Sequence, residues 1–240
     1  MLYGIISDVH GNLAALRNVL EHMPEVDVLV CLGDIVGYGP DPDECVDIIR
    51  QNASLSVLGN HDVACATGAG LEAFNADAAC ACEWTARHLS PASRNYLAGL
   101  PTTETRTDIT MVHGSPCEPI WEYVHSESVA ARNFPFFQTR YCLVGHTHLP
   151  AVFCLRDGRV ESLSPPFLQP QQFTQGRYII NPGSVGQPRD HNPHASFAVL
   201  DTESGRLQHF RVAYPIAETQ AKMRAAGLPS RLIARLAYGW

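Results

Sequence analysis

The chain has 240 residues, of which 45% are hydrophobic and 17% charged, and its 24 acidic and 17 basic residues give a formal net charge of −7. This length suits one large α/β domain or a domain with a small appendage, and the composition excludes collagen-like, coiled-coil and disordered chains. No cluster of lysine and arginine forms the basic stripe with which non-specific nucleic-acid binders neutralise phosphates, so we expect no long nucleic acid as a partner.

The first part of the sequence alternates strand-like and helix-like segments. Apolar runs predict buried strands at 2–7, 26–32 and 54–58, and periodic patterns predict helices at 13–22 and 42–51. Asn12 is suited to cap the first helix. This alternation predicts parallel strands that are joined by right-handed crossovers.

The second part is richer in strands. Residues 71–100 predict two helices broken at Ser90-Pro91, and Asp157-Gly158 predicts the turn of a hairpin within AVFCLRDGRVESL. Strands are also expected at 108–113, at 141–145 and in three segments between 177 and 214, and helices at 215–226 and 230–238. The Pro/Gln-rich stretch at 164–176 is the only plausible flexible insert.

The two parts fit together in a two-sheet sandwich that is flanked by helices. We therefore expect an α/β fold with four α/β/β/α layers, forming a single domain over 1–240 with the helices of 215–238 as an appendage.

The N-terminus lacks the basic segment and cleavage site of a signal peptide, and no apolar run reaches the roughly 20 residues that span a bilayer. We expect a cytoplasmic protein without a membrane partner. The eight cysteines include no CxxC pair and several lie in apolar patterns, which favours free thiols acting as small hydrophobes.

Side chains that can bind metals follow the predicted strands, beside glycine. In chain order the motifs are Asp8-Val9-His10-Gly11, Gly33-Asp34, Gly59-Asn60-His61-Asp62, His113-Gly114 and His146-Thr147-His148. Sites assemble at the carboxyl ends of parallel strands, and glycine lets the backbone pass close to a bound ion. A lone histidine at a strand end is more often a packed side chain than a ligand, but the conjunction of five motifs predicts a metal site.

Aspartate, histidine and asparagine, without thiolate, offer hard oxygen and borderline nitrogen ligands. This set favours manganese, iron, zinc or cobalt over calcium, which prefers all-oxygen sites. Asp8 and His10 are two residues apart, so one loop can turn both toward one ion. His146 and His148 share that spacing and could serve two adjacent ions.

The ordered set DVHGN, GD, GNHD, HG and GHTH resembles the calcineurin-like metallophosphoesterase superfamily from Met1 to about Pro188. GDIVGYGPDP, NPGSVGQP and the ending RVAYPI…GLPSRLIARLAYG resemble a bacterial branch of small phosphodiesterases. The resemblance implies two divalent metal ions, with manganese or iron favoured, and a hydroxide bridging them as the nucleophile. Carried over residue by residue, it implies that Asp8, His10 and His148 hold the first ion, that Asn60, His113 and His146 hold the second, and that Asp34 bridges the two.

The resemblance also implies roles beside the ions. His61 would stabilise charge on the phosphoryl oxygens or protonate the leaving oxygen. Asp62 is similar to the residue that orients this histidine, although an acidic residue there could equally cap a helix. Tyr38 either stacks on a ring of the substrate or anchors its loop. Arg189 is the candidate cationic contact to phosphate, and the alternative is a solvated surface arginine.

Two further features bear on the site. The segment 181–184 (NPGS) predicts a tight turn packed against the GHTH loop. Trp121 follows the His113 loop and could line the cleft, although packing is the commoner role of tryptophan.

The expected function is hydrolysis of a phosphoester, and a diester in a small molecule or nucleotide is favoured. The alternatives are a phosphomonoesterase, a hydrolase of dinucleoside polyphosphates, and an inactive metal-binding scaffold, which the presence of all seven ligands disfavours. The segment after Asp34, IVGYGPDP, lacks the acidic-Arg-Gly signature of related protein Ser/Thr phosphatases, which argues against that activity. A homo-oligomer is compatible with the sequence.

Overall fold

The computed structural model describes residues 1–240 and contains two six-stranded sheets. The first sheet has the spatial order β3 (Leu55–Ser56), β2 (Val28–Cys31), β1 (Leu2–Ile6), β11 (Ala195–Asp201), β12 (Arg206–Val212) and β9 (Gln171–Gln172). The second has the order β4 (Thr103–Arg106), β5 (Ile109–Val112), β6 (Tyr141–Leu143), β10 (Arg177–Asn181), β7 (Ala151–Arg156) and β8 (Arg159–Leu163). Each sheet mixes parallel and antiparallel pairs.

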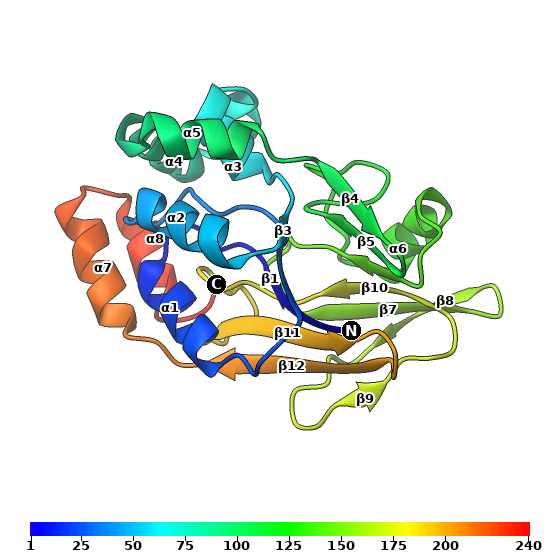
Figure 1. Cartoon of the computed structure of the whole chain (residues 1–240). Coiled ribbons are helices and arrows are strands. Elements are labelled where there is room, and N and C mark those ends of the chain that lie inside the picture. The colour runs from blue at the N-terminus through cyan, green and yellow to red at the C-terminus, as the bar shows by residue number, and fades with distance from the viewer.

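Eight α-helices surround the sheets (Figure 1). They are α1 (Leu13–His22), α2 (Pro42–Asn52), α3 (Asn60–Thr67), α4 (Ala76–His88), α5 (Pro91–Ala98), α6 (Glu127–Asn133), α7 (Ile216–Ala225) and α8 (Ser230–Arg235). Short 3-10 turns lie at Leu71–Ala73 and Phe134–Phe136. Figure 1 shows α3, α4 and α5 as one group at the top of the view and α6 on the other side, beside β4 and β5.

The alternation of strand and helix in the first part produces parallel pairing, as the sequence predicts. β1 pairs with β2, and β2 pairs with β3, both in parallel. The three strands therefore end at the same edge of the sheet, and the loops that follow them meet there. The outer neighbour of β1 is the antiparallel strand β11, which comes from the far end of the chain.

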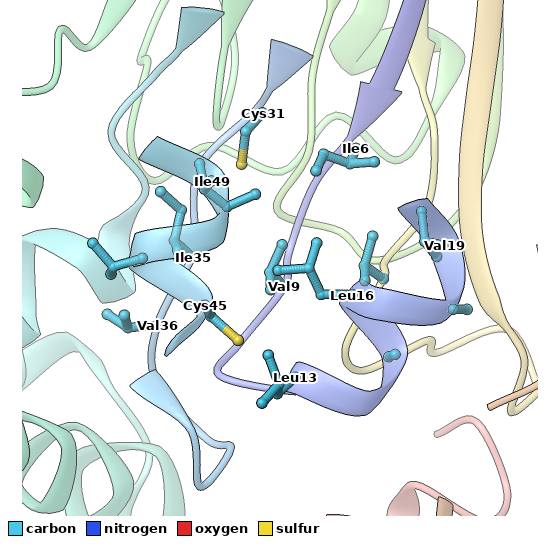
Figure 2. Close-up of a cluster of buried hydrophobic side chains, with 14 of the residues drawn as sticks. Ile6, Val9, Leu13, Leu16, Val19, Cys31, Ile35, Val36, Cys45 and Ile49 are labelled. Carbon is cyan, nitrogen blue, oxygen red and sulfur yellow. The ribbon is translucent and has the colours of Figure 1, made fainter. Parts of the chain in front are cut away.

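The two faces of the first sheet are both buried, because residues of β1 and β2 point alternately to helices and to the second sheet. Ile6 and Cys31 belong to the core between this sheet and helices α1 and α2, together with Leu16 and Ile49 (Figure 2). Ile5 lies on the opposite face, in the core between the two sheets.

The second sheet is covered in the same way. Met111 and Leu143 face the first sheet, whereas Cys142 and Val112 pack against α6 through Val129. The order of layers is therefore helices, sheet, sheet, helix, which confirms the predicted α/β/β/α fold.

Local signals in the sequence fix several boundaries. The Asn12 side chain accepts a hydrogen bond from the Ala15 amide at 3.2 Å and caps α1. Ser90 caps α5 and Pro91 is its first residue, so the predicted break between α4 and α5 is confirmed. Asp157 and Gly158 have φ values of 50° and 74° and form the predicted turn between β7 and β8.

Three elements were not predicted, and one expectation was wrong. Helices α3 and α6 and strand β4 are short, and β4 is largely exposed, so none carries a clear apolar period. The stretch 164–176 is not simply a flexible insert. Its residues Gln171–Gln172 pair with β12, and Phe173 is 4% exposed in the core between the sheets.

The C-terminal helices pack on the rest of the molecule through their own apolar cluster. Leu232 and Ile233 of α8 and Leu236, directly after the helix, are buried with Met223 of α7 and with Tyr38, which lies in the loop after β2. None of the helices combines the length and the apolar character that a bilayer crossing requires.

Candidate metal centre and cleft

The seven predicted metal ligands converge where strands of both sheets end. All of them are buried, with exposed fractions between 0% and 4%. They fall into two groups, one made of Asp8, His10, Asp34 and His148 and the other of Asp34, His113 and His146. The ligand atoms within each group lie within 4.8 Å of one another. Asn60 joins the second group, because its Oδ1 is 3.1 Å from Nε2 of His113.

The backbone is strained at most of these positions. Asp8, His10, Asp34, His146 and His148 all have positive φ, between 50° and 65°. Residues other than glycine rarely adopt this conformation, and they keep it only where the surrounding structure enforces it, typically at functional sites. The strain turns each side chain back toward the ends of the strands.

Main-chain carbonyls fix the orientation of all four candidate imidazole ligands. Nδ1 of His10, His113 and His148 lies 3.1, 2.8 and 2.6 Å from the carbonyl oxygens of Val36, Leu32 and Gln187. His146 is turned over, with Nε2 3.1 Å from the Trp121 oxygen. Because the nitrogen next to the carbonyl carries the proton, the other nitrogen presents its lone pair to the centre, as in metal-binding histidines.

Asp34 lies between the two groups. Its Oδ1 accepts a hydrogen bond from the His61 amide at 2.8 Å. Its Oδ2 is 3.3 Å from Nε2 of His113 and 3.7 Å from Nε2 of His10, one histidine from each group. Gly59 makes this approach possible, because a Cβ atom on it would lie 2.1 Å from Asp34 Oδ1.

The residues fit a pair of metal ions. Both carboxylate oxygens of Asp8 and Oδ2 of Asp34 are buried without a hydrogen-bond partner, which is costly unless a cation binds there. Nε2 of His10 lies 3.1 Å from Nε2 of His148, and Nε2 of His113 lies 3.1 Å from Nδ1 of His146. Metal–nitrogen bonds of about 2.0–2.1 Å place two ligands of one ion roughly 3.0–3.4 Å apart.

The protonation of the centre agrees with this fit. Burial lowers the pKa of His146 to about 3 and holds the pKa values of His10 and His148 well below the ordinary value, so these rings are neutral ligands. Burial raises the pKa of Asp8 to about 6. Burial would lower the pKa of His113, but Asp34 raises it to about 9. In the absence of metal the His113 ring is therefore protonated beside Asp34, and a bound cation would displace this proton.

Comparison with known proteins decides the family. The sequence model of the calcineurin-like phosphoesterase superfamily domain matches residues 1–205. The chain belongs to this superfamily. A crystal structure of a metallophosphoesterase from Sphaerobacter thermophilus is 46% identical, has a TM-score of 0.91, and is matched over 100% of this chain and 99% of that chain.

Related sequences align with either the whole of this phosphoesterase or only one segment of it. An uncharacterised protein of Methanocaldococcus jannaschii is 34% identical over 99% of this chain and 98% of its own length. A symmetrical bis(5′-nucleosyl)-tetraphosphatase of Thioalkalivibrio sulfidiphilus is 36% identical over 63 residues, which are 24% of this chain and 23% of that protein. The latter similarity concerns only one segment of the phosphoesterase.

His61 borders the metal centre of the phosphoesterase without joining either group of ligands. It is the second residue of α3, lines a cavity of about 240 Å³ with Asp34, and lies 4.8 Å from the His10 ring, centroid to centroid. Its Nδ1 lies 3.2 Å from Sγ of Cys82, which leaves Nε2 available to the cavity. Burial would lower the pKa of His61, but the charges of Asp34 and Cys82 raise it above its ordinary value.

Asp62 takes the second of its two predicted roles. Its carboxylate accepts hydrogen bonds from the amides of Ile35, Val36 and Gly59 at 2.9, 3.1 and 3.1 Å, and it caps α3. Both of its oxygens are committed to these backbone donors, so its carboxylate does not hydrogen-bond to the His61 ring that it was expected to orient. The polar group beside the ring is the thiol of Cys82.

Tyr38 and Arg189 both line the cavity. The Tyr38 ring lies 4.3 Å from the His61 ring and 4.6 Å from the His10 ring, centroid to centroid, and has a positive φ of 59°. Tyr38 is 6% exposed and belongs to a buried cluster, so it anchors its loop. Arg189 is not a solvated surface residue, since its Nη2 donates to the Tyr38 hydroxyl at 3.4 Å and to Gln187 Oε1 at 2.9 Å.

Asn181 holds the GHTH loop as the sequence predicts. Its Nδ2 donates to the Gly145 carbonyl at 2.6 Å and to Thr147 Oγ1 at 3.0 Å. Its Oδ1 accepts from the Gly183 amide at 2.8 Å, which closes the tight turn. The turn therefore positions His146 and His148 rather than contacting a ligand itself.

Several cavity residues were not found from the sequence. Trp121, which was considered, does line the cavity, next to Phe74 and Tyr123. Arg235 of α8 lines it from the opposite end of the chain. No motif marks these residues, because their place in the cleft depends on how α8 and the loop after His113 pack.

Proposed function

We propose that this phosphoesterase is a dinuclear metal-dependent hydrolase that cleaves phosphodiesters in small molecules or nucleotides. The observation that carries the proposal is Asp34 Oδ2, a buried oxygen without a hydrogen-bond partner that faces one histidine of each ligand group. In the proposal Asp8, His10 and His148 bind one ion, Asn60, His113 and His146 bind the other, and Asp34 binds both. The mixed nitrogen and oxygen ligands favour manganese or iron, with zinc or cobalt as alternatives.

Two bound cations would neutralise the phosphoryl oxygens and lower the pKa of water. The protein must then protonate the leaving oxygen, and His61 is suited to this because its raised pKa favours the imidazolium. Cys82 occupies Nδ1, so Nε2 is the nitrogen that would give its proton to the leaving group. Arg189 lines the same cavity and would bind an anionic part of the substrate.

The shape of the cleft supports a diester. A diester carries a substituent on two of its oxygens, and the cavity beside the candidate metal centre is lined by two chemically different kinds of side chain. One wall is aromatic, formed by Phe74, Trp121 and Tyr123, and is suited to stack on a nucleotide base or another ring. The other kind of side chain is cationic and is supplied by Arg189 and Arg235.

A hydrolase of dinucleoside polyphosphates is the second candidate. It is favoured by the local similarity to bis(5′-nucleosyl)-tetraphosphatases, which act on such compounds by their name, and by the combination of aromatic and cationic walls. Rates on bis-p-nitrophenyl phosphate, p-nitrophenyl phosphate and diadenosine tetraphosphate, measured with the same manganese-loaded protein, would rank the diesterase, monoesterase and polyphosphate hydrolase activities. A metal-binding scaffold would hydrolyse none of them.

The first test replaces the shared carboxylate. Asp34→Asn should reduce hydrolysis of bis-p-nitrophenyl phosphate below about 1% of wild type, because a neutral amide no longer draws two cations together. The variant should also lose at least one of two equivalents of manganese, measured by mass spectrometry of the dialysed protein. Asp47→Asn, an exposed residue paired with Arg50, is the matched control.

The second test separates metal binding from proton transfer. His61→Ala should keep its manganese and lose about 100-fold or more in kcat, which is the usual contribution of a general acid. A His61→Ala protein with the wild-type rate would show that His61 is not the proton donor, and the two-metal proposal would then depend on Asp34→Asn alone.

A further inference from the structure

Two cavities form a continuous cleft that leads from the metal centre to the C-terminal helix. The inner cavity of about 240 Å³ is lined by Asp34 and His61 and also by Arg189 and Arg235. The outer cavity of about 530 Å³ shares Arg235 with it and is also lined by Arg231. Three guanidinium groups therefore follow one another outward from the proposed metals.

Arg189 stands at the start of this row and lacks an acidic partner. It forms no ion pair, and its Nη2 contacts only the neutral oxygens of Tyr38 and Gln187. Its Nε is buried without any hydrogen-bond partner. A half-buried guanidinium with an unpartnered Nε and no carboxylate beside it is costly in the free protein and is expected where an anion binds.

Arg235 follows Arg189 and is equally free of a carboxylate side chain. Its Nε donates to the main-chain oxygen of Trp240, and its two terminal nitrogens have no partner and remain open to the cleft. Burial and, second, the positive charge of Arg189 together lower the pKa of Arg235 to about 10. Two cations thus lie close enough to repel each other while facing the same space.

The outer part of the row repeats the pattern. Arg231 and Arg235 are four residues apart on α8, which places like charges on the same side of the helix at some cost to its stability. Asp77 lines the same outer cavity but forms no ion pair with either arginine. Arg189, Arg231 and Arg235 thus bring three positive charges to one cleft in a chain with a net charge of −7.

We infer that Arg189 and Arg235 form a second anion site beside the metal centre, which binds a phosphoryl group linked to the one that is cleaved. The inference deepens the proposed function and rests on it for the position of the scissile phosphate. The ligand class is a compound with at least two linked phosphoryl groups, such as a nucleoside diphosphate or its esters, with its aromatic part on the wall of Trp121 and Tyr123. Guanidinium groups bind phosphate through paired charge-assisted hydrogen bonds, which gives this site its selectivity.

Arg235 lies outside residues 1–205, which match the superfamily domain. Helix α8 is tied to the catalytic half of the chain through Leu232 and Leu236, which share a buried cluster with Tyr38. The same tyrosine contacts His61 on one side and Arg189 on the other. The C-terminal segment therefore places the second anion site at a fixed position relative to the metal centre.

The test compares two nucleotides that differ by one phosphoryl group. Binding of adenosine 5′-monophosphate and of non-hydrolysable α,β-methylene adenosine diphosphate is measured by calorimetry, with the same free manganese concentration in cell and syringe. Wild type should bind the diphosphate at least about ten-fold more tightly, because charge-assisted hydrogen bonds of this kind are worth a factor of ten or more. Arg235→Gln should remove most of that preference while affecting the monophosphate less than about three-fold.

Two variants guard against a purely structural effect. Arg235→Lys keeps the charge without the guanidinium contact to Trp240 and should lose less of the diphosphate preference than Arg235→Gln. Arg224→Gln, an exposed arginine on α7, should leave both affinities unchanged. Equal losses for both nucleotides in Arg235→Gln, an unchanged preference, or no binding of either nucleotide to wild type would overturn the inference.

The binding measurement does not depend on turnover. If wild type prefers the diphosphate analogue but fails to hydrolyse bis-p-nitrophenyl phosphate or any other ester, the proposed function is wrong and the anion site stands. If it hydrolyses the diester but shows no diphosphate preference, only the second anion site is refuted.

Discussion

Cys82 of α4 lies against Nδ1 of His61, the position that Asp62 was expected to take. A hydrogen bond with the Cys65 thiol lowers the pKa of Cys82, and the His61 ring lowers it as well. These effects outweigh burial, which would raise it, and the pKa of Cys82 is about 6. An anionic sulfur at this point would hold the proton on Nδ1 and stabilise the imidazolium form of His61. In the proposed mechanism Cys82 would be a positioning residue, since it would act on the reacting group only through His61.

Replacement of Cys82 tests this role. Cys82→Ala should lower kcat for bis-p-nitrophenyl phosphate by about ten-fold, because His61 loses the partner that fixes its tautomer, which is part of the total contribution of a general acid. Manganese content and KM should change little, and Cys82→Ser should retain more activity than Cys82→Ala.

The control for this prediction lies on the same helix. Cys80 is exposed, so Cys80→Ala should keep the wild-type rate. A Cys82→Ala protein with an unchanged kcat would show that the thiol only fills space beside His61.

Single residues differ in how far the sequence reveals them. The seven candidate ligands could be predicted because each lies in the segment that follows a strand and within two residues of glycine or another ligand, so the local sequence carries the signal. Cys82 and Arg235 could not be predicted, because both lie inside helices. Their distance from the site is set by the packing of α4 and α8, on which the neighbouring sequence says nothing.

At the scale of secondary structure, β12 supports the metal centre from the other sheet. Nε2 of His209 lies 2.9 Å from the carbonyl oxygen of Asn181, the residue that holds the GHTH loop. Nδ1 of His209 is buried without a partner, and burial lowers the pKa of this histidine to about 4. His209 is therefore a neutral donor that links β12 to the end of β10.

This link predicts an acid-sensitive stability. Between the unfolded pKa of about 6.5 and the folded pKa of about 4, the unfolded chain carries a proton on His209 that the folded chain lacks. The contribution of His209 to the free energy of unfolding is therefore complete above about pH 6.5. It is lost between about pH 6.5 and pH 4, at up to about 1.4 kcal/mol per pH unit.

Urea unfolding of metal-free protein at about pH 7 and pH 5 would measure the effect. His209→Gln keeps a donor for the Asn181 carbonyl but cannot titrate, so its free energy of unfolding should depend less on pH than that of wild type. An identical pH dependence in both proteins would show that other groups cause the acid sensitivity.

The predictability of elements follows their length and burial. The strands at 2–7 and 26–32 and the helix at 13–22 were predicted because their apolar runs or periods are long and bounded by polar turns. Helix α3 was not predicted, since half of its eight residues NHDVACAT are polar and the first three, Asn60, His61 and Asp62, belong to the site or its capping. The positions at the start of α3 hold residues of the site, so they cannot also hold the apolar residues by which a helix is predicted.

For the molecule as a whole, the candidate metal ligands come from both sheets. Asp8, His10, Asp34 and Asn60 follow β1, β2 and β3, whereas His113, His146 and His148 follow β5 and β6. Bound ions would therefore join the two halves of the sandwich and relieve the repulsion among the buried carboxylates. Metal binding is expected to stabilise the whole fold and not only the loops.

A thermal unfolding experiment tests this coupling. Free manganese at about 100 times its Kd adds about 2.7 kcal/mol of stability, which corresponds to a rise of roughly 5–10 °C in Tm for a chain of this size. Calcium at the same concentration should have a smaller effect, because half of the ligands are imidazoles. Asp34→Asn should show a reduced rise, and a manganese-independent Tm in wild type would contradict the proposed ions.

The sandwich and its four layers were predicted, but the order of strands in each sheet was not. Which strands pair depends on contacts between residues far apart in the chain. The pairing of Leu2 with Asp201 is an example that no local pattern contains.

The interior place of β1 in its sheet has a consequence for how the protein is made. β1 is synthesised first, yet one of its two neighbours, β11, begins only at Ala195, after the last candidate ligand has left the ribosome. A truncated chain ending at residue 188 would hold every ligand and still present the open edge of β1 to solvent. The loops that hold the candidate ligands thus depend on β11, which is synthesised late and contributes no ligand. Substitutions that destabilise β11 should therefore reduce metal binding first.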